Sequence, residues 1–282
     1  MSTALVTDSN AMLPATLRDR FSVRVVPLTI VLDGRPYTEG VDLIAADFAA
    51  RMRTGATVST AAPSPGAFVA VYDAAADEGA DAILSVHIGS NTSATVDSAR
   101  LAARESRVPV ELVDTGTASF PVACCVWAAG SVLEAGGPLE AAADAARAVA
   151  ASVGNVFVVG ALDLASRGGR LRGPAAAEAE AAGVAVLALR DGAMDVVAHA
   201  DDVDQAVAAM AEEVEQAAAA RPLRVGVGDA AAEGLATALA TRLEDKAGVE
   251  ELVRYEVGPS VVAHTGLGTA GAVYFPAGLA RP

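Results

Sequence analysis

Two short stretches rich in hydroxyl side chains are the part of this sequence best suited to bind an anion. One is the turn Gly89-Ser90-Asn91-Thr92-Ser93, which follows the apolar run 82–88 and precedes a helical pattern. The other runs from Val58 to Gly66 and also precedes a helical pattern. The first turn of a helix carries unpaired N–H groups at the positive end of the helix dipole, which favours an anion. We expect the two turns to face each other around a carboxylate, although helix caps and turns alone would also use these hydroxyls.

Other polar residues follow predicted strands in the same way. Asp8 and Ser9 follow the first strand, and the segment Asp114–Ser119 follows a later one. Arg170, on a glycine-rich loop, and His264 complete the set. Ligands of α/β sheets bind beyond the carboxyl ends of the strands, so these residues indicate the polar end of an otherwise apolar pocket. An arginine on such a loop can bind an anion or a network of carboxylates. Alternatively, it can pair with acidic side chains at the surface.

Strands and helices alternate along the chain and must position these residues. Strands are predicted at 4–7, 23–32, 82–88, 110–113, 155–160, 184–189, 196–200, 223–227, 252–257 and 272–275. Helices are predicted at 14–20, 44–53, 65–78, 94–104, 120–134, 139–151, 202–219 and 230–246. Ser64 is expected to cap a helix, and Asp33-Gly34 and Asp191-Gly192 are expected to be turns. The alternation predicts an α/β fold in both halves, with domains at 1–153 and 154–282.

Charge and hydropathy exclude several classes of protein. The chain of 282 residues has a formal net charge of −15, so it should repel nucleic acid and acidic membrane surfaces. Lys246 is its only lysine, which removes Walker-type and Schiff-base lysine chemistry from most of the chain. No apolar run reaches 18 residues, and the N-terminus lacks the basic start of a signal peptide. We therefore expect a cytoplasmic protein without stable membrane insertion.

Metal chemistry is also not expected. Cys124 and Cys125 are neighbours in an apolar helical pattern, so they point apart and are interpreted as buried thiols. No two of the three histidines lie within helical spacing of each other, which argues against a zinc site. His87 and His199 lie in or at the end of predicted strands and are interpreted as structural histidines.

Two parts of the sequence resemble enzyme motifs. The segment Gly266–Gly271 matches the dinucleotide-binding pattern, but a predicted strand follows it where a helix is required. A serine hydrolase or acyltransferase would use Ser93 as nucleophile and His264 as base, although the turn at Ser93 is not the G-x-S-x-G elbow. That alternative stays open, as does a sensor of a small polar ligand.

Taken together, seven short motifs in this order resemble the DegV family over nearly the whole chain. They are Thr7-Asp8-Ser9, Val26-Pro27-Leu28 with Asp33-Gly34 and Tyr37, Pro63–Gly66, Ser93–Ala99, Asp114–Ser119, Gly168-Gly169-Arg170 and His264–Gly268. The resemblance implies two α/β domains with a ligand site at their interface. It further implies a long-chain fatty acid as ligand, with its alkyl chain in an apolar tunnel of the C-terminal domain. Some members are the lipid-binding subunits of bacterial fatty acid kinase, which present the carboxylate to a separate ATP-dependent kinase.

Site residues follow from the resemblance position by position. Thr60 and Ser93 would hydrogen-bond the carboxylate, Arg170 and His264 would form a supporting network, and Asp8 and Ser9 would shape the pocket floor. Ala94, Thr265 and Gly266 lie in the same motifs and are included in the site. No catalytic residue, cofactor or metal is implied.

This sequence departs from the family pattern at several motif positions. Ala61-Ala62 replaces Ser-Gln, Ala94 replaces glycine, and Leu267 replaces proline. The hydroxyls at 60 and 93 are retained, and two hydroxyl donors with helix N–H groups can satisfy a carboxylate without a cation. Burial of about 14 to 16 methylenes at about 0.8 kcal/mol each could outweigh the dehydration of the headgroup.

Overall fold

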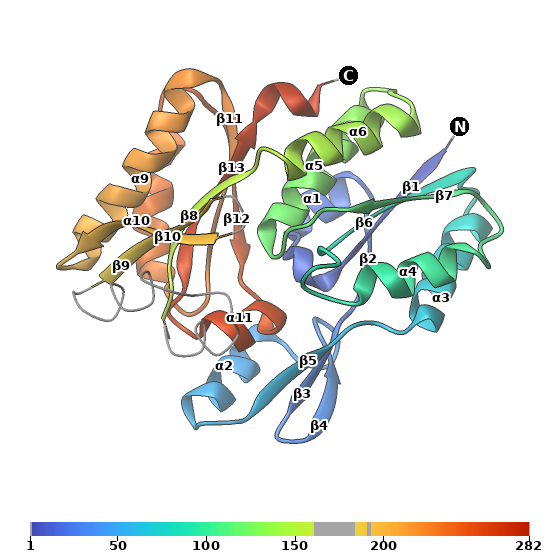
Figure 1. Ribbon diagram of the computed structural model, residues 1–282, viewed down its shortest axis with the longest axis horizontal. Helices are drawn as coiled ribbons and strands as arrows, with labels where there is room; N and C mark the ends of the chain where they lie inside the picture. Colours follow the sequence, from blue (N-terminus) through green and yellow to red (C-terminus); the bar gives the residue numbers. More distant parts are fainter. Residues whose placement is uncertain (1, 161–183, 191–192, 282) are drawn as a thin grey trace. The chain divides into compact units, whose positions relative to one another are not determined.

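The computed structural model describes residues 2–160, 184–190 and 193–281. The chain forms two compact units (Figure 1). The first unit comprises Met1–Ile44, Thr57–Ser152 and Gly278–Pro282, and the second comprises Ala45–Ala56 and Val153–Ala277. The domain ranges expected from the sequence, 1–153 and 154–282, stay a prediction.

A parallel four-stranded sheet forms the centre of the first unit. Its order is β2-β1-β6-β7, with bounds Arg24–Val26, Thr3–Asp8, Ala82–His87 and Val110–Asp114. Every residue of β6 is buried, as expected for a strand covered on both faces. All pairs are parallel, so β1, β6 and β7 end at the same edge of the sheet. The predicted α/β class is confirmed for this unit.

Two helical layers cover this sheet. One layer contains α3 (Pro65–Asp77) and α4 (Thr95–Ala103), whose Phe68, Tyr72 and Ala99 pack with Ile83 of β6. The other contains α5 (Phe120–Glu134) and α6 (Leu139–Ala150), and every residue from Phe120 to Val132 is buried. Figure 1 shows the sheet between these layers. The short helices α1 (Ala15–Arg20) and η1 (Ser9–Ala11) connect β1 to β2.

A small antiparallel sheet completes the first unit. Its order is β4-β3-β5, with bounds Arg35–Thr38, Thr29–Leu32 and Val58–Ala61. The predicted hairpin turn is confirmed, because Asp33 and Gly34 both have positive φ, 51° and 79°. The prediction of one strand over 23–32 was wrong, since β2 and β3 belong to different sheets. Pro27 has no N–H to continue a ladder, and the N–H of Leu28 donates to Ser9 Oγ.

The second unit has a mixed six-stranded sheet. Its order is β10-β9-β8-β13-β11-β12, and only β11 and β12 pair in parallel. The bounds are β8 Gly154–Val158, β9 Val184–Arg190, β10 Ala193–Ala200, β11 Leu223–Asp229, β12 Val249–Glu256 and β13 Ala270–Pro276. Its core joins this sheet to α9 (Val203–Ala220) and α10 (Glu233–Glu244) through Val156, Met210, Leu239 and Ala272. Helix α2 (Ala45–Arg53) also belongs to this unit, and η2 (Ala277–Ala280) follows β13.

Sequence interpretation missed one helix of the second unit. Helix α11 (Pro259–Thr265) follows Gly258 and ends at Gly266, whose φ is 80°. Proline in the first helical turn and glycine after the last residue are the usual boundaries of a helix, so the signal was present. The expected strand after Gly266–Gly271 is confirmed as β13. The expected turn at 191–192 lies outside the described residues.

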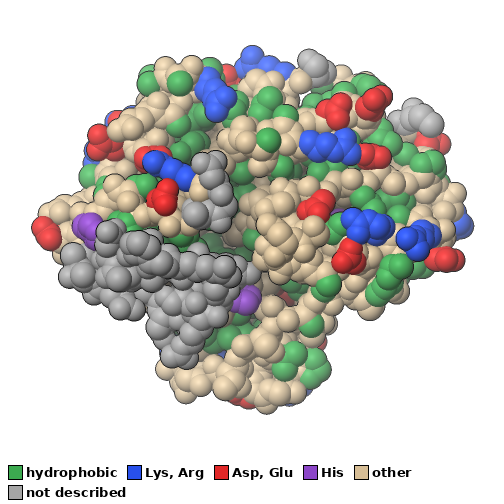
Figure 2. All heavy atoms as spheres, viewed as in Figure 1, with side chains coloured by type: hydrophobic (Ala, Val, Ile, Leu, Met, Phe, Trp, Pro, Cys, Tyr) green, Lys and Arg blue, Asp and Glu red, His purple; other side chains and the backbone are tan. Residues whose placement is uncertain are grey.

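Charged side chains on the first unit are largely arranged in ion pairs. Arg24 pairs with Glu78 at 2.5 Å and Arg20 with Glu134 at 2.7 Å, and Arg107 bonds both Asp73 and Asp77. On the face drawn in Figure 2, acidic and basic side chains lie in small mixed groups. Such exposed pairs contribute little stability each, about 0 to 1 kcal/mol.

Candidate functional site

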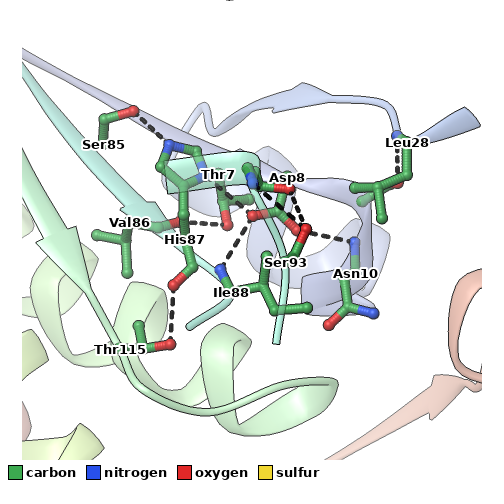
Figure 3. Close-up of polar contacts among 12 residues, drawn as sticks. Thr7, Asp8, Asn10, Leu28, Ser85, Val86, His87, Ile88, Ser93 and Thr115 are labelled. Atoms are coloured by element: carbon green, nitrogen blue, oxygen red, sulfur yellow. Dashed lines mark hydrogen bonds and ion pairs between the residues drawn. The ribbon is translucent and has the colours of Figure 1, made fainter. Parts of the chain in front are cut away.

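Asp8, at the carboxyl end of β1, is the centre of a buried polar cluster. Its Oδ1 accepts a hydrogen bond from the N–H of Asn10 at 3.0 Å and so caps η1. Its Oδ2 accepts from the N–H of Ile88 at 3.1 Å and lies 2.9 Å from His87 Nδ1 (Figure 3). The carboxylate therefore joins the end of β1 to the end of β6. Asp8 was predicted as a site residue, and its oxygens are used for this structural connection.

His87 continues the cluster into the interior. Its Nε2 lies 2.6 Å from Ser85 Oγ, which lies 2.9 Å from the hydroxyl of Tyr72. All three side chains and Asp8 are almost completely buried. Burial raises the pKa of Tyr72 to about 12, although its bond with Ser85 lowers it, so the hydroxyl keeps its proton at neutral pH. With the ring proton on Nδ1 alone, His87 donates to Asp8 and Nε2 accepts from Ser85 Oγ, which leaves Ser85 to accept from Tyr72.

The hydrogen-bonded side chains of Ser85, His87 and Asp8 lie where they can stabilise the fold but cannot act on a substrate. Ser85 is 0% exposed and lies inside the central strand of the sheet, where a substrate has no access. The prediction that His87 is a satisfied structural histidine is confirmed. The role of Ser85 was missed, and the signal was the spacing of two polar residues, at 85 and 87, on one face of an otherwise apolar strand.

Ser9 makes a second connection. Its Oγ accepts from the N–H of Leu28 at 2.9 Å and donates to Glu39 Oε2. Ser9 is half-buried and Glu39 is buried. Ser9 thereby links the end of β1 to the strands that follow it.

Ser93 lies close to a helix N-terminus, as predicted. Helix α4 begins at Thr95, and its N-cap, Ala94, offers no side-chain acceptor. Ser93 Oγ instead accepts from the N–H of Thr95 at 3.3 Å and lies 2.8 Å from Thr95 Oγ1. Ser93 is half-buried and Ala94 is exposed. A partly accessible hydroxyl therefore stands at the positive end of a helix dipole.

The loop that carries Ser93 is fixed on both sides. The N–H groups of Thr92 and Ser93 donate to the carbonyl of Gly89, at 2.9 and 3.1 Å. The N–H of Gly89 donates to Thr117 O at 2.7 Å, and a Cβ on Gly89 would lie 2.6 Å from the carbonyl carbon of Gly116. Only glycine permits this approach between the ends of β6 and β7.

Asp114 supports the same loop from the end of β7. Its Oδ1 accepts from the N–H groups of Ser90 and Gly116, at 3.0 and 3.2 Å. Burial would raise the pKa of Asp114, but the bonds from the Ser90 hydroxyl and from both N–H groups outweigh burial and lower it. The carboxylate therefore stays ionised and anchors the loop from outside the sheet.

Thr60 lies on β5, opposite Ile30 of β3. The expectation that 58–61 belong to a turn was wrong, because these residues pair with β3 as a strand. It is half-buried, whereas its neighbours Ser59 and Ala61 are exposed. Thr60 and Ser93 belong to the same unit, and among the described residues no hydrogen bond joins their hydroxyl groups. The expectation that they share a ligand stays a prediction.

The remaining predicted residues lie elsewhere. The second unit carries His264, Thr265 and Gly266 at the C-terminal end of α11. Thr265 Oγ1 donates to Val261 O at 3.3 Å, and the N–H of Gly266 donates to Val262 O at 2.8 Å. Arg170 is outside the described residues. The alternative nucleophile and base, Ser93 and His264, come from different units.

Ser119, the last residue of the predicted segment Asp114–Ser119, has a backbone conformation that the sequence did not indicate. It precedes α5 with φ 66° and ψ −152°, a region that is essentially restricted to glycine. Its N–H donates to Asn10 Oδ1 at 2.7 Å, and Asn10 is itself held by Asp8. Nothing in the sequence indicates this conformation, because serine is common before helices with ordinary backbone angles.

The interpretation of Cys124 and Cys125 as buried thiols is confirmed. Both are 0% exposed in α5, and burial raises the pKa of each thiol, that of Cys125 to about 12. Within the described residues, no group of three or more His, Cys, Asp or Glu side chains is arranged to bind a metal ion. None of the helices in the described part of the chain is long and apolar enough to span a membrane.

Comparison with known proteins assigns this architecture to a family. The family model described as "uncharacterised protein, DegV family" matches residues 2–277. A DegV domain-containing protein of Streptomyces coelicolor is 37% identical over 272 residues, covering 96% of this chain and 97% of that protein. A solved structure described as "fatty acid binding of a DegV family protein from Thermus thermophilus" is 34% identical with a TM-score of 0.88, covering 98% of this chain and 100% of its own. DegV from Bacillus subtilis, described as a fatty acid binding protein, shares the fold at 24% identity and a TM-score of 0.83, covering 97% of this chain and 99% of its own. The chain therefore belongs to the DegV family.

Proposed function

We propose that this protein binds a long-chain fatty acid non-covalently and performs no chemistry on it. The observation that carries the proposal is the match to the Thermus thermophilus protein, which is described as binding a fatty acid and which aligns over both chains almost completely. The placement of Ser93 supports it, because a half-buried hydroxyl before α4 is chemically suited to a carboxylate.

In this proposal, the hydroxyl groups of Thr60 and Ser93 donate hydrogen bonds to the carboxylate. Ala94 at the N-cap provides no competing acceptor, so the start of α4 adds its dipole. Asp97 in the first turn of α4 opposes an anion, but it pairs with Arg100 at 2.5 Å. The headgroup is therefore bound by neutral donors and a helix terminus.

The rest of the site follows the same proposal. Asp8 and Ser9 form its floor through the bonds described above, and the end of α11, with His264, Thr265 and Gly266, contributes from the C-terminal domain. Arg170 joins the supporting network. The alkyl chain lies in an apolar tunnel of that domain, where each buried methylene contributes about 0.8 kcal/mol.

We also propose that the bound acid is presented to a separate ATP-dependent fatty acid kinase, which forms the acyl phosphate. This chain supplies the carboxylate in an ordered position and leaves phosphoryl transfer to its partner. The net charge of −15 favours a partner with a basic docking face.

The first prediction tests the two hydroxyls together. Delipidated protein with Thr60→Ala and Ser93→Ala should bind a long-chain fatty acid more than tenfold more weakly, or about 1.4 kcal/mol, because two donors to a buried carboxylate are lost. Isothermal titration calorimetry measures the affinity, and a thermal melt checks that the protein stays folded.

The matched control removes two neighbouring hydroxyls, Ser59→Ala and Thr92→Ala. Ser59 is exposed beside Thr60 on β5, and Thr92 is exposed in the loop of Ser93. Unchanged affinity in the Thr60/Ser93 variant would contradict these roles. Ester turnover that disappears with Ser93→Ala alone would favour the hydrolase instead, whereas a retained, unmodified fatty acid in native mass spectrometry supports binding.

A further inference from the structure

We propose that His87 is a positioning residue for Ser93 and that it acts through the Asp8 carboxylate. Only the predicted effect on fatty acid affinity rests on the function proposed above. The positioning itself is a property of the first unit. His87 lies too deep to touch a ligand, since it is 0% exposed. Its influence must therefore pass through groups that it contacts.

The path from His87 to Ser93 consists of hydrogen bonds and one peptide unit. His87 Nδ1–H donates to Asp8 Oδ2 at 2.9 Å, and the same oxygen accepts from the N–H of Ile88 at 3.1 Å (Figure 3). The next residue, Gly89, accepts the N–H of Ser93 at 3.1 Å. The Asp8 carboxylate thus holds the N–H of Ile88, one of the contacts that fix the start of the loop.

The contact at Nε2, on the other side of the imidazole ring, favours Nδ1 as the hydrogen-bond donor to Asp8. Ser85 Oγ lies 2.6 Å from Nε2 and 2.9 Å from the Tyr72 hydroxyl, so Ser85 can accept from Tyr72 and donate to Nε2 while Nδ1 carries the ring proton. A buried carboxylate needs such donors, because burial without them is costly. Asp8 has three: His87, Ile88 and Asn10. Loss of the histidine removes the only side-chain donor to this carboxylate among the described residues.

The backbone at His87 is fixed independently of its side chain. Its carbonyl accepts from both the N–H and the hydroxyl of Thr115, at 3.2 and 2.8 Å. Strand pairing with β7 also passes through this residue. A substitution of the imidazole therefore leaves the strand end in place. Comparing a donor with a non-donor of similar size isolates the Asp8 contact from the ring contacts with Ser85 and Phe68, which both variants lose.

The experiment compares His87→Asn with His87→Leu, which have similar size. The Asn amide nitrogen can take the place of Nδ1–H and donate to Asp8, whereas Leu cannot. Both variants lose thermal stability. We expect amide exchange of Thr92 and Ser93 to be faster by about tenfold in His87→Leu and within about threefold of wild type in His87→Asn. Hydrogen exchange read by NMR resolves these amides.

Fatty acid affinity provides the second readout. It should fall about tenfold in His87→Leu and recover in His87→Asn, a rescue that a purely structural role does not predict. Equal exchange rates at Ser93 in the two variants overturn the positioning role. A wild-type protein that binds no fatty acid overturns the proposed function instead, and the exchange comparison still decides the positioning.

Two milder variants cover the case in which His87→Leu does not fold. Ser85→Ala removes the donor that fixes the ring, so exchange at Ser93 should rise by about threefold. Tyr72→Phe removes the partner of Ser85 but leaves Ser85 and the ring in place, so exchange at Ser93 should rise less than in Ser85→Ala. Wild-type exchange in Ser85→Ala contradicts the proposal.

Discussion

At the scale of single residues, Ser119 shows how the Asp8 cluster stabilises an unfavourable backbone conformation. A non-glycine residue with φ 66° and ψ −152° costs about 1 to 3 kcal/mol. The bond from its N–H to Asn10 Oδ1 at 2.7 Å helps to maintain this conformation. Asn10 is in turn positioned by Asp8, so β1 and the start of α5 are coupled through one short turn.

Substitution of Ser119 by glycine should therefore stabilise the protein. Relief of strain exceeds the extra entropy of glycine in the unfolded chain, which costs about 0.5 to 1 kcal/mol, so we expect a net gain of about 1 kcal/mol. Urea unfolding measures it. Ser119→Ala is the control, because alanine retains the Cβ and hence the strain. If the glycine variant is no more stable than the alanine variant, strain at this position is not significant.

At the scale of elements, the close approach of the β6 and β7 ends depends on Gly89. In Gly89→Ala the new Cβ would lie 2.6 Å from the Gly116 backbone, so the loop must move. We expect a loss of about 1 to 3 kcal/mol of stability and weaker fatty acid binding, because Ser93 moves with the loop. Chemical unfolding and calorimetric titration measure the two effects.

Gly66→Ala in α3 is the matched control for that substitution. Its Cβ would meet only Ser64 Oγ at 3.8 Å, an ordinary contact, and the helical site favours alanine by up to about 1 kcal/mol. A Gly89→Ala variant as stable and as tightly binding as wild type would show that the approach to Gly116 is unimportant.

Local signals explain which elements the sequence could predict. Ser64 and Pro65 mark the start of α3, and the Ser64 hydroxyl accepts from Ala67 N–H at 3.3 Å as expected of an N-cap. The Asp33-Gly34 hairpin is equally local. The break between β2 and β3 was missed because it depends on the distant hydroxyl of Ser9, which takes the N–H of Leu28. That long-range contact leaves no pattern in the strand, but Pro27 does, because a proline cannot donate to the ladder.

The candidate site could likewise be predicted from local signals but not where distant residues meet. The position of Ser93 at a helix start could be predicted, since strand, polar turn and helix follow one another in the sequence. The partners of Asp8 could not, because His87 and Ile88 come from a strand about 80 residues away and only the parallel pairing of β1 with β6 brings them together. Residue types show which chemistry is available, and strand order decides which groups meet.

At the scale of the whole molecule, the proposed ligand must interact with both units to be bound as the family resemblance implies. In the proposed function, its carboxylate binds to the first unit at Ser93, and its alkyl chain binds to the second unit. A ligand at 100 times its dissociation constant stabilises the folded state by about 2.7 kcal/mol. That stabilisation should be distributed over every segment that the ligand touches.

Hydrogen exchange therefore tests the two-unit site directly. Addition of a saturating long-chain fatty acid should slow exchange at 92–98, around the start of α4, and also at 259–266, which covers α11. The fatty alcohol of equal length is the control: without a carboxylate it should give little protection at 92–98 because it cannot accept from Thr60 and Ser93 as a charged group. Protection limited to α11 with both compounds would mean that the tail binds but the hydroxyl turns do not recognise the headgroup. Protection at 92–98 with the acid alone, together with protection of α11, is the result that the proposed two-unit site predicts.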